Sequence, residues 1–191
     1  MISVRDVCLK AKEAAFELAT TTTNDRNAIL NCIADALEKS LDKVYDANAL
    51  DIEVARGHLS DPMIDRLTLN ESRVNTMIEG LRQVASLPDP MGEVTDSWET
   101  KNGLKFTKVR VPLGTIAVIY ESRPNVTIDV AALCLKSGNC VVLRGGKEAI
   151  NSNRALYEII YKALSDNGFN PNIVGFIDDT TRESSAELLK Q

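Results

Sequence analysis

The stretch GTIAVIYESRPNVTIDVAALCLKSGNCVVLRGGKE, residues 114–148, decides the fold that we expect for this chain. It opens with an apolar run at Gly114–Tyr120, continues with a helical pattern from about Val126 to Lys136, and returns to an apolar run at Cys140–Arg144. Strands written as continuous apolar runs, alternating with helices, are typical of a parallel sheet that is buried on both faces. The stretch therefore predicts a βαβ unit.

The same alternation continues to the end of the chain. A helix is predicted from about Glu148 to Leu164, a third strand at Asn172–Ile177, and a last helix at Thr181–Lys190 that Thr180 or Thr181 can cap. In open parallel sheets, ligands bind beyond the carboxyl ends of the strands. That rule selects the loops after the three predicted strands as candidate sites.

The residues before this unit follow a helical pattern. Apolar side chains recur at helical spacing from Ser3 to Leu18. Asn24 is the expected N-cap of a second helix that runs to about Ser40, and a third helix is predicted at Val44–Ala55. Pro62 fits the first turn of a short helix, and Asn70 can cap a longer one. We expect the first 87 residues to be almost wholly helical.

The turn cluster LPDPMG separates the helices from a predicted hairpin, with strands at 93–100 and 104–111 around Lys101–Gly103. Both strands carry many polar residues, which makes the hairpin a poor core element. We expect it to project and to pair with something outside its own domain. An exposed ribbon without a partner is the alternative.

Composition excludes several classes of protein. The chain has 191 residues, of which 44% are hydrophobic, enough for a packed core. Its 22 basic and 27 acidic residues are mixed along the sequence and give a formal charge of −5, which argues against nucleic acid as a partner. No stretch approaches the roughly 20 apolar residues of a membrane span, and the charged N-terminus is unlike a signal peptide. These features predict a cytoplasmic protein that has no membrane partner.

Cysteine and histidine usage argues against a metal site and against several kinds of catalysis. Cys8, Cys32, Cys134 and Cys140 stand singly inside apolar patterns, which predicts small core side chains. The one histidine, His58, lies in the loop-like segment ARGHLSDP. A catalytic triad or a Cys-His pair would have to use it, and nothing around it favours that role.

The first candidate loop, Glu121–Asn125, precedes a helix. A helix N-terminus favours an anionic or carbonyl-bearing ligand. The alternative is that Asn125 or Thr127 merely caps the helix and that Arg123 is a surface charge.

The second candidate loop is Gly145–Lys147. Its glycines allow the backbone to approach a ligand or to adopt a positive φ, and Arg144 and Lys147 offer charge to a phosphate or a ribose. A tight strand-to-helix turn with solvated charges remains the alternative, since RGGK alone is not a specific motif. The third loop, Asp178–Thr181, is acidic and is interpreted as a structural turn.

Residues 110–153, RVPLGTIAVIYESRPNVTIDVAALCLKSGNCVVLRGGKEAINSN, resemble the γ-glutamyl phosphate reductases, also called glutamate-5-semialdehyde dehydrogenases. That family belongs to the aldehyde dehydrogenase superfamily. The segments DPMIDRL (61–67) and LPDPMGEV (87–94) extend the resemblance over essentially the whole chain.

The resemblance implies an α/β fold, with an aldehyde-dehydrogenase-like, Rossmann-type parallel sheet that follows an N-terminal helical segment and a projecting β-hairpin. Residues 1–92 would be the helical part of the cofactor domain, 93–111 an oligomerisation hairpin that makes a homo-oligomer, and 112–191 the dinucleotide-binding segment. The family's catalytic domain, with its nucleophilic cysteine, would lie beyond this chain. We therefore expect the chain alone to be inactive.

The implied activity is NADPH-dependent reduction of L-glutamate 5-phosphate to L-glutamate 5-semialdehyde, with release of phosphate, in proline biosynthesis. In the family a cysteine thiolate attacks the acyl carbon, and hydride reduces the resulting thioester. Two alternatives stay open. One is a non-catalytic dinucleotide-binding or assembly module, and the other is an acylating aldehyde dehydrogenase that uses a coenzyme A thioester.

The resemblance also implies roles for loop residues. Lys147, together with Arg144, favours NADPH, because an acid at the position of Lys147 would repel the 2′-phosphate. Arg123 and Asn125 are the predicted substrate-binding residues; either could bind the oxyanion, and Arg123 could instead hold the leaving phosphate. The predicted cofactor-binding residues are Tyr120, Glu121, Ser122, Arg144, Gly145, Gly146 and Lys147.

Overall fold

The computed structural model describes residues 3–191. Its helices are α1 (Val4–Leu18), α2 (Thr23–Glu38), α3 (Leu41–Ala55), α4 (Asp61–Leu67), α5 (Glu71–Ser86), α6 (Asn125–Lys136), α7 (Ile150–Asp166) and α8 (Arg182–Leu188). The strands are β1 (Val94–Glu99), β2 (Lys105–Val109), β3 (Thr115–Ile119), β4 (Cys140–Arg144) and β5 (Val174–Phe176). Two 3₁₀ turns, η1 (Lys147–Ala149) and η2 (Pro171–Ile173), precede α7 and β5.

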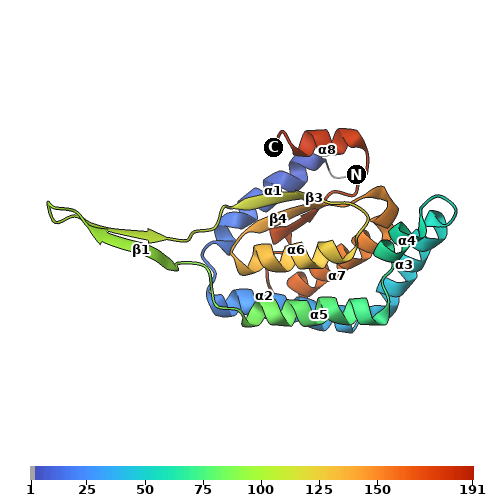
Figure 1. Cartoon of the computed structure of the whole chain (residues 1–191), viewed down its shortest axis with the longest axis horizontal. Coiled ribbons are helices and arrows are strands. Elements are labelled where there is room, and N and C mark those ends of the chain that lie inside the picture. The colour runs from blue at the N-terminus through green and yellow to red at the C-terminus, as the bar shows by residue number, and fades with distance from the viewer. Residues whose placement is uncertain (1–2) are drawn as a thin grey trace.

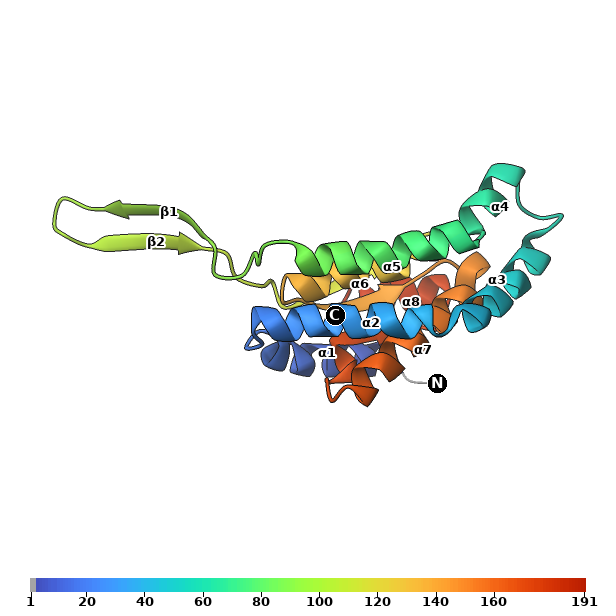
Figure 2. The same ribbon diagram turned by 90° about the horizontal axis from the view of Figure 1, so that it is seen from below.

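The strands β3, β4 and β5 form a parallel sheet in the order β3-β4-β5, which confirms the predicted α/β fold class. Helix α1 packs on one face with α8 beside it, while α6 and α7 cover the other face (Figure 1). Helices α2 and α5 lie side by side as an outer layer over α6 and α7 (Figure 2). One continuous apolar core joins these layers.

Exposure differs between the strands of the sheet. All five residues of the central strand β4 are buried, as predicted from its apolar run. In β3 no residue is fully buried, and Ile119 is 43% exposed. The prediction that this strand is covered on both faces is therefore wrong. It lies at the edge of the sheet, where no described strand lies on its far side.

Several boundaries differ from the sequence-based prediction for local reasons. Thr22, not Asn24, caps α2, because its side chain and that of Asp25 exchange hydrogen bonds with each other's backbone in a capping box. The third helix starts three residues earlier than expected, at Leu41. Asn172 and Ile173 belong to the η2 turn, so β5 is shorter than the predicted strand.

Other helix signals are confirmed. The side chain of Asn70 accepts a hydrogen bond from the N–H of Arg73 at the start of α5, and Pro62 lies in the first turn of α4. Thr181 caps α8 by accepting a hydrogen bond from the N–H of Ser184. None of the helices formed by residues 3–191 combines the length and the apolar character that crossing a membrane requires.

The hairpin β1–β2 projects from the body at the end opposite the carboxyl ends of the parallel strands (Figure 1). Every residue of both strands is exposed. The rings of Trp98 and Phe106 stack across the two strands, with 5.3 Å between their centroids. A projecting hairpin was predicted, and the structure adds an exposed aromatic pair on it.

The root of the hairpin is fixed to the body by Asp89. Its carboxylate accepts hydrogen bonds from the Thr23 hydroxyl, from Arg26 Nη2 at 2.5 Å and from the N–H of Met91 at 2.9 Å. Close by, the Nζ of buried Lys136 donates to Asn27 and to the carbonyl oxygen of Ala85. Buried Arg26 therefore holds the segment from which the hairpin leaves, and buried Lys136 fixes the end of α5 just before it.

Candidate functional site

The three predicted loops meet at the carboxyl edge of the sheet. β3 pairs with β4 up to Ile119 opposite Arg144, and the N–H of Ile177, just after β5, donates to the carbonyl oxygen of Leu143 at 2.9 Å. The Ser122 hydroxyl donates to Glu148 Oε2 at 2.9 Å, which links the first loop to the second. Basic, acidic and backbone groups from all three loops therefore lie at this edge of the sheet.

Arg144 is only 9% exposed, and its terminal N–H groups form hydrogen bonds within the protein. Its guanidinium donates to the carbonyl oxygens of Thr180 at 2.6 Å, Thr181 at 2.8 Å and Gly145 at 3.2 Å. Its Nε is buried without a partner. In this conformation Arg144 ties the third loop to the end of β4, so binding a ribose would require rearrangement.

Lys147 has a different setting. It begins the η1 turn and is exposed, and no hydrogen bond or ion pair occupies its ammonium among the interactions of residues 3–191. Its neighbour Glu148 is engaged by Ser122. Lys147 is therefore the cation of the second loop that is available to an external anion.

The glycines of the second loop serve close packing. Neither has a positive φ, so that part of the expectation is wrong. A Cβ on Gly145 would collide with the side-chain amide of Asn153 and approach Tyr120 Cε2 to 3.1 Å. A Cβ on Gly146 would come within 3.2 Å of the Glu121 carbonyl carbon. Gly146 lets the second loop lie directly on the first, while Gly145 lets the end of β4 pack against Asn153 and Tyr120.

A chain of buried hydrogen bonds joins Tyr120, Thr127 and Asn153 next to this contact between the loops. The Tyr120 hydroxyl lies 2.7 Å from Thr127 Oγ1, and Thr127 donates to Asn153 Oδ1 at 3.0 Å. Tyr120 then donates to Thr127, because that hydroxyl's proton is already used. Burial is the main cause that raises the pKa of Tyr120 to about 12, so the phenol stays neutral. The Nδ2 of Asn153 has no partner, which leaves one buried donor beside Gly145.

In the first loop, Glu121 and Arg123 are exposed, and Asn125 is the first residue of α6. The suggested capping role of Asn125 or Thr127 is wrong: Pro124 occupies the N-cap position, and the Asn125 amide donates to Asp129 at 2.8 Å within the helix. The start of α6 has no side-chain cap, and its N–H groups of Val126 and Thr127 donate to the carbonyl oxygens of Arg123 and Pro124, at 3.1 Å each. The assignment of Arg123 and Asn125 to substrate stays a prediction.

The third loop is a hydrogen-bonded turn. Asp179 Oδ1 accepts from the N–H of Thr181 at 2.8 Å, and hydrogen bonds to Thr181 are the main cause that lowers the pKa of Asp179. Asp178 pairs with Arg154 at 2.7 Å. These acids are used within the protein, as expected of a structural turn.

The four cysteines are in settings that disfavour a thiolate. Cys134 and Cys140 are buried, and Cys8 and Cys32 are half-buried. Burial is the main cause that raises the pKa of each thiol, to about 11 for Cys32 and about 12 for Cys140. None of these thiols is activated as a nucleophile.

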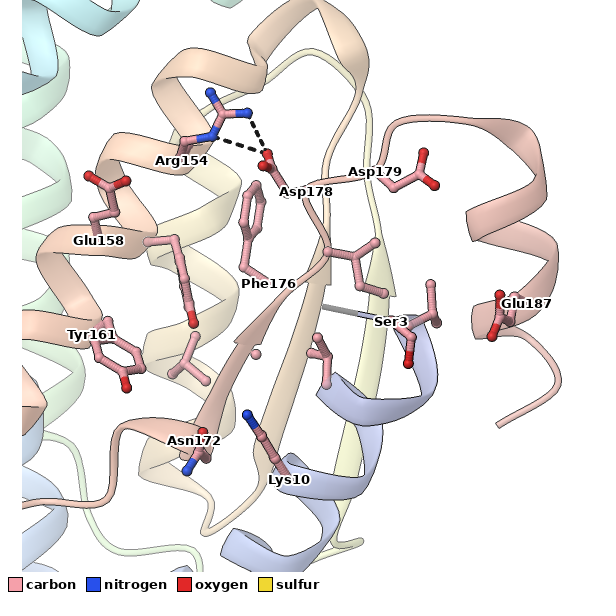
Figure 3. A pocket seen from close by; sticks show the side chains of 16 residues that line it. Ser3, Lys10, Arg154, Glu158, Tyr161, Asn172, Phe176, Asp178, Asp179 and Glu187 are labelled. Atoms are coloured by element: carbon pink, nitrogen blue, oxygen red, sulfur yellow. Dashed lines mark hydrogen bonds and ion pairs between the residues drawn. The ribbon is translucent and has the colours of Figure 1, made fainter. Parts of the chain in front are cut away.

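A cavity of about 630 Å³ lies along β5 between α7 and the α1–α8 side (Figure 3). Aromatic side chains of Tyr157, Tyr161 and Phe176 line it, with the Arg154–Asp178 pair at one end and Lys10 toward the other (Figure 3). It does not include Arg144 or Lys147. The cavity and the predicted cofactor loop are therefore separate features.

Sequence reasoning missed the residues that hold the loops in place: Asn48, Asp51, Thr127, Glu148 and Asn153. Each is polar, and all but Glu148 are buried. The available signal for Asn48 and Asp51 was their i, i+3 spacing on α3, which puts two polar side chains on one helix face.

The residues at this edge fit a dinucleotide in part. The exposed Lys147 is free to meet a phosphate group, and Arg144 Nε and Asn153 Nδ2 are buried donors without partners. A parallel sheet with helices on both faces and polar loops at its carboxyl edge defines the class: an α/β protein of the nucleotide-binding type.

The chain belongs to the aldehyde dehydrogenase family, whose sequence profile matches residues 3–191. The gamma-glutamyl phosphate reductase of Enterococcus faecalis is 50% identical over 182 residues, which are 95% of this chain and 44% of that protein. The enzyme of the same name from Carboxydothermus hydrogenoformans is 49% identical over all 191 residues, or 46% of its length.

A solved structure supports the same relationship. The crystal structure of gamma-glutamyl phosphate reductase from Thermotoga maritima is similar with a TM-score of 0.93 and 40% identity, over 98% of this chain and 46% of that one. The chain thus spans about half the length of the relatives it matches.

Proposed function

We infer that this chain is the NADPH-binding part of an oxidoreductase that reduces L-glutamate 5-phosphate to L-glutamate 5-semialdehyde in the cytoplasm, releasing phosphate, in proline biosynthesis. The similarity to gamma-glutamyl phosphate reductases supports the activity. The observation that carries the cofactor choice is Lys147, an exposed and unengaged cation at the end of the central strand.

The chain's own residues would bind and orient the cofactor. Lys147 would attract the 2′-phosphate, while Gly146 keeps the two loops close enough to share one ligand. The cofactor would supply the reducing equivalent. Because the pKa of every cysteine thiol in the chain is raised, the nucleophile would come from outside this chain. The chain alone would then be inactive.

Titration with NADPH and NADH, followed by calorimetry, tests the cofactor choice. We expect tighter binding of NADPH, and Lys147→Glu should weaken it by about tenfold or more while affecting NADH less, since a hydrogen bond to a charged group is worth roughly 1.5–3 kcal/mol. Arg182→Glu, a charge reversal on α8, is the matched control and should leave the preference unchanged. Equal affinity of the native chain for both nucleotides would refute the assignment.

A second role is favoured by the exposed hairpin. We infer that residues 93–111 mediate assembly of a homo-oligomer, because the stacked Trp98 and Phe106 expose apolar surface on two strands with free edges. Sedimentation of the full-length enzyme, with and without Trp98→Ser, tests this role. An unchanged oligomeric state in the variant would exclude it.

A further inference from the structure

The N-terminus of α7 is capped by a side chain from another helix. The residue at its N-cap position, Ala149, has no side chain that can accept a hydrogen bond. Asp51 on α3 takes that role: Oδ2 accepts from the N–H of Ser152 at 2.8 Å, and Oδ1 from the N–H of Asn151 at 3.1 Å. These two donors are the ones that a local N-cap residue would satisfy.

Side-chain donors complete the arrangement. The Ser152 hydroxyl donates to Asp51 at 2.6 Å, and the Asn151 amide donates at 2.9 Å. Asp51 is 3% exposed, so its charge is stabilised by these donors and by the positive end of the helix. Asn48, one turn away, binds the Ser152 hydroxyl and the backbone of Leu67 and Leu69.

The contact between α3 and the start of α7 also holds the turn that carries Lys147. Ala149 is fully buried in a small core with Ala55 and Leu67. Lys147 is two residues before this anchor, in η1, and Asn151 is two residues after it. The turn is therefore fixed from the α3–α4 side by the buried cap and from the first loop by the Glu148–Ser122 hydrogen bond.

We propose that Asp51 is a positioning residue for cofactor selection: by capping α7 in trans it fixes the Lys147 turn and keeps anions away from the start of that helix. A free helix N-terminus attracts phosphate without distinguishing one phosphate of a dinucleotide from another. With that end occupied by a carboxylate, Lys147 becomes the anion-binding group of the turn. The idea rests on the proposed function, since it presumes that Lys147 meets the 2′-phosphate.

The test compares Asp51→Asn with Asp25→Asn. Asp25 is also a carboxylate that accepts hydrogen bonds at a helix start, in the capping box of α2 and away from the loops, so its loss removes a helix cap without touching the Lys147 turn. We expect Asp51→Asn to weaken NADPH binding about three- to tenfold more than NADH binding, and Asp25→Asn to leave the ratio of the two dissociation constants unchanged. A purely structural role for Asp51 would leave that ratio as it is in the native chain.

A second measurement needs no nucleotide. Hydrogen exchange of the amides of residues 147–149 should be about tenfold faster in Asp51→Asn than in Asp25→Asn, because the anchor of the turn is loosened. If Asp51→Asn does not fold, Asn151→Ala removes one donor to the carboxylate and should give smaller changes in the same direction. Native exchange rates at 147–149 in these variants would overturn the proposal.

The outcomes separate the two hypotheses. If Lys147→Glu abolishes the NADPH preference and Asp51→Asn leaves it intact, only the positioning role fails. If Lys147→Glu has no effect, the cofactor assignment fails, while the exchange rates still decide whether Asp51 holds the turn.

Discussion

Gly145 shows how a single residue sets the geometry of the candidate site. We predict that Gly145→Ala lowers the free energy of unfolding by about 1–3 kcal/mol, because the added methyl group would collide with the buried amide of Asn153 and crowd Tyr120. Urea denaturation measures the change. NADPH affinity should fall as well, since Tyr120 lies directly before the first loop.

The control for this prediction is Gly80→Ala. Gly80 lies within α5, and a Cβ there would meet no atom within 4 Å. This substitution should stabilise the chain by roughly 0.5–1 kcal/mol, because alanine has the higher helix propensity. A Gly145→Ala variant as stable as the native chain would contradict the packing role of Gly145.

At the residue scale, sequence locates the loops but not the partners of their side chains. Arg144 and Lys147 are both basic residues in one short motif, yet one is buried among carbonyl oxygens and the other is exposed. The carbonyl groups that bind Arg144 come from Thr180 and Thr181, more than 30 residues later. No local pattern reports a contact of that kind.

Among the elements, the hairpin depends on a short segment at its root. We predict that Asp89→Asn destabilises the chain by about 2 kcal/mol or more, because it leaves buried Arg26, which is 2% exposed, and buried Lys136 without their nearby carboxylate. Hydrogen exchange of residues 87–92 should increase together with the loss of stability.

Asp96→Asn is the matched control. Asp96 is exposed in β1, and its carboxylate accepts a hydrogen bond only from the N–H of Ser97 among the described interactions. Its loss should change stability by less than about 0.5 kcal/mol. Equal effects of the two substitutions would show that the buried charges do not depend on Asp89.

Element types follow from the sequence more closely than element environments do. The strand Cys140–Arg144 was predicted with its observed bounds, because its apolar residues are fixed by burial from both sides. The apolar run of β3 looks the same in sequence, yet the strand lies at an exposed edge. Periodicity cannot distinguish the two, since exposure depends on which strand lies next in the sheet.

On the scale of the whole molecule, the strand order of the sheet predicts a further strand. In the doubly wound arrangement with order 3-2-1-4, the first three strands occupy the positions of β5, β4 and β3, and a fourth pairs with the first. The relatives are about twice as long as this chain. We therefore expect that, in these longer relatives, a further strand pairs with the edge that corresponds to β3.

This expectation predicts how the chain behaves by itself. The edge of β3 is flanked by exposed apolar side chains, among them Ile119 at 43% and Leu113 at 87%, so the chain should associate as its concentration rises. Ile119→Lys should reduce this association, measured by sedimentation velocity, because a lysine on an edge strand opposes pairing with another edge. The melting temperature should stay nearly unchanged, since the side chain is already exposed.

The control distinguishes this edge from the hairpin, which is the other exposed β-structure. Phe106→Ser removes an exposed ring from β2 and leaves the edge of β3 intact. If the isolated chain associates through β3, Ile119→Lys reduces association even in a Phe106→Ser background, where the ring of the hairpin is already absent. If Phe106→Ser alone abolishes association, the hairpin accounts for all of it, and β3 is an edge that tolerates exposure.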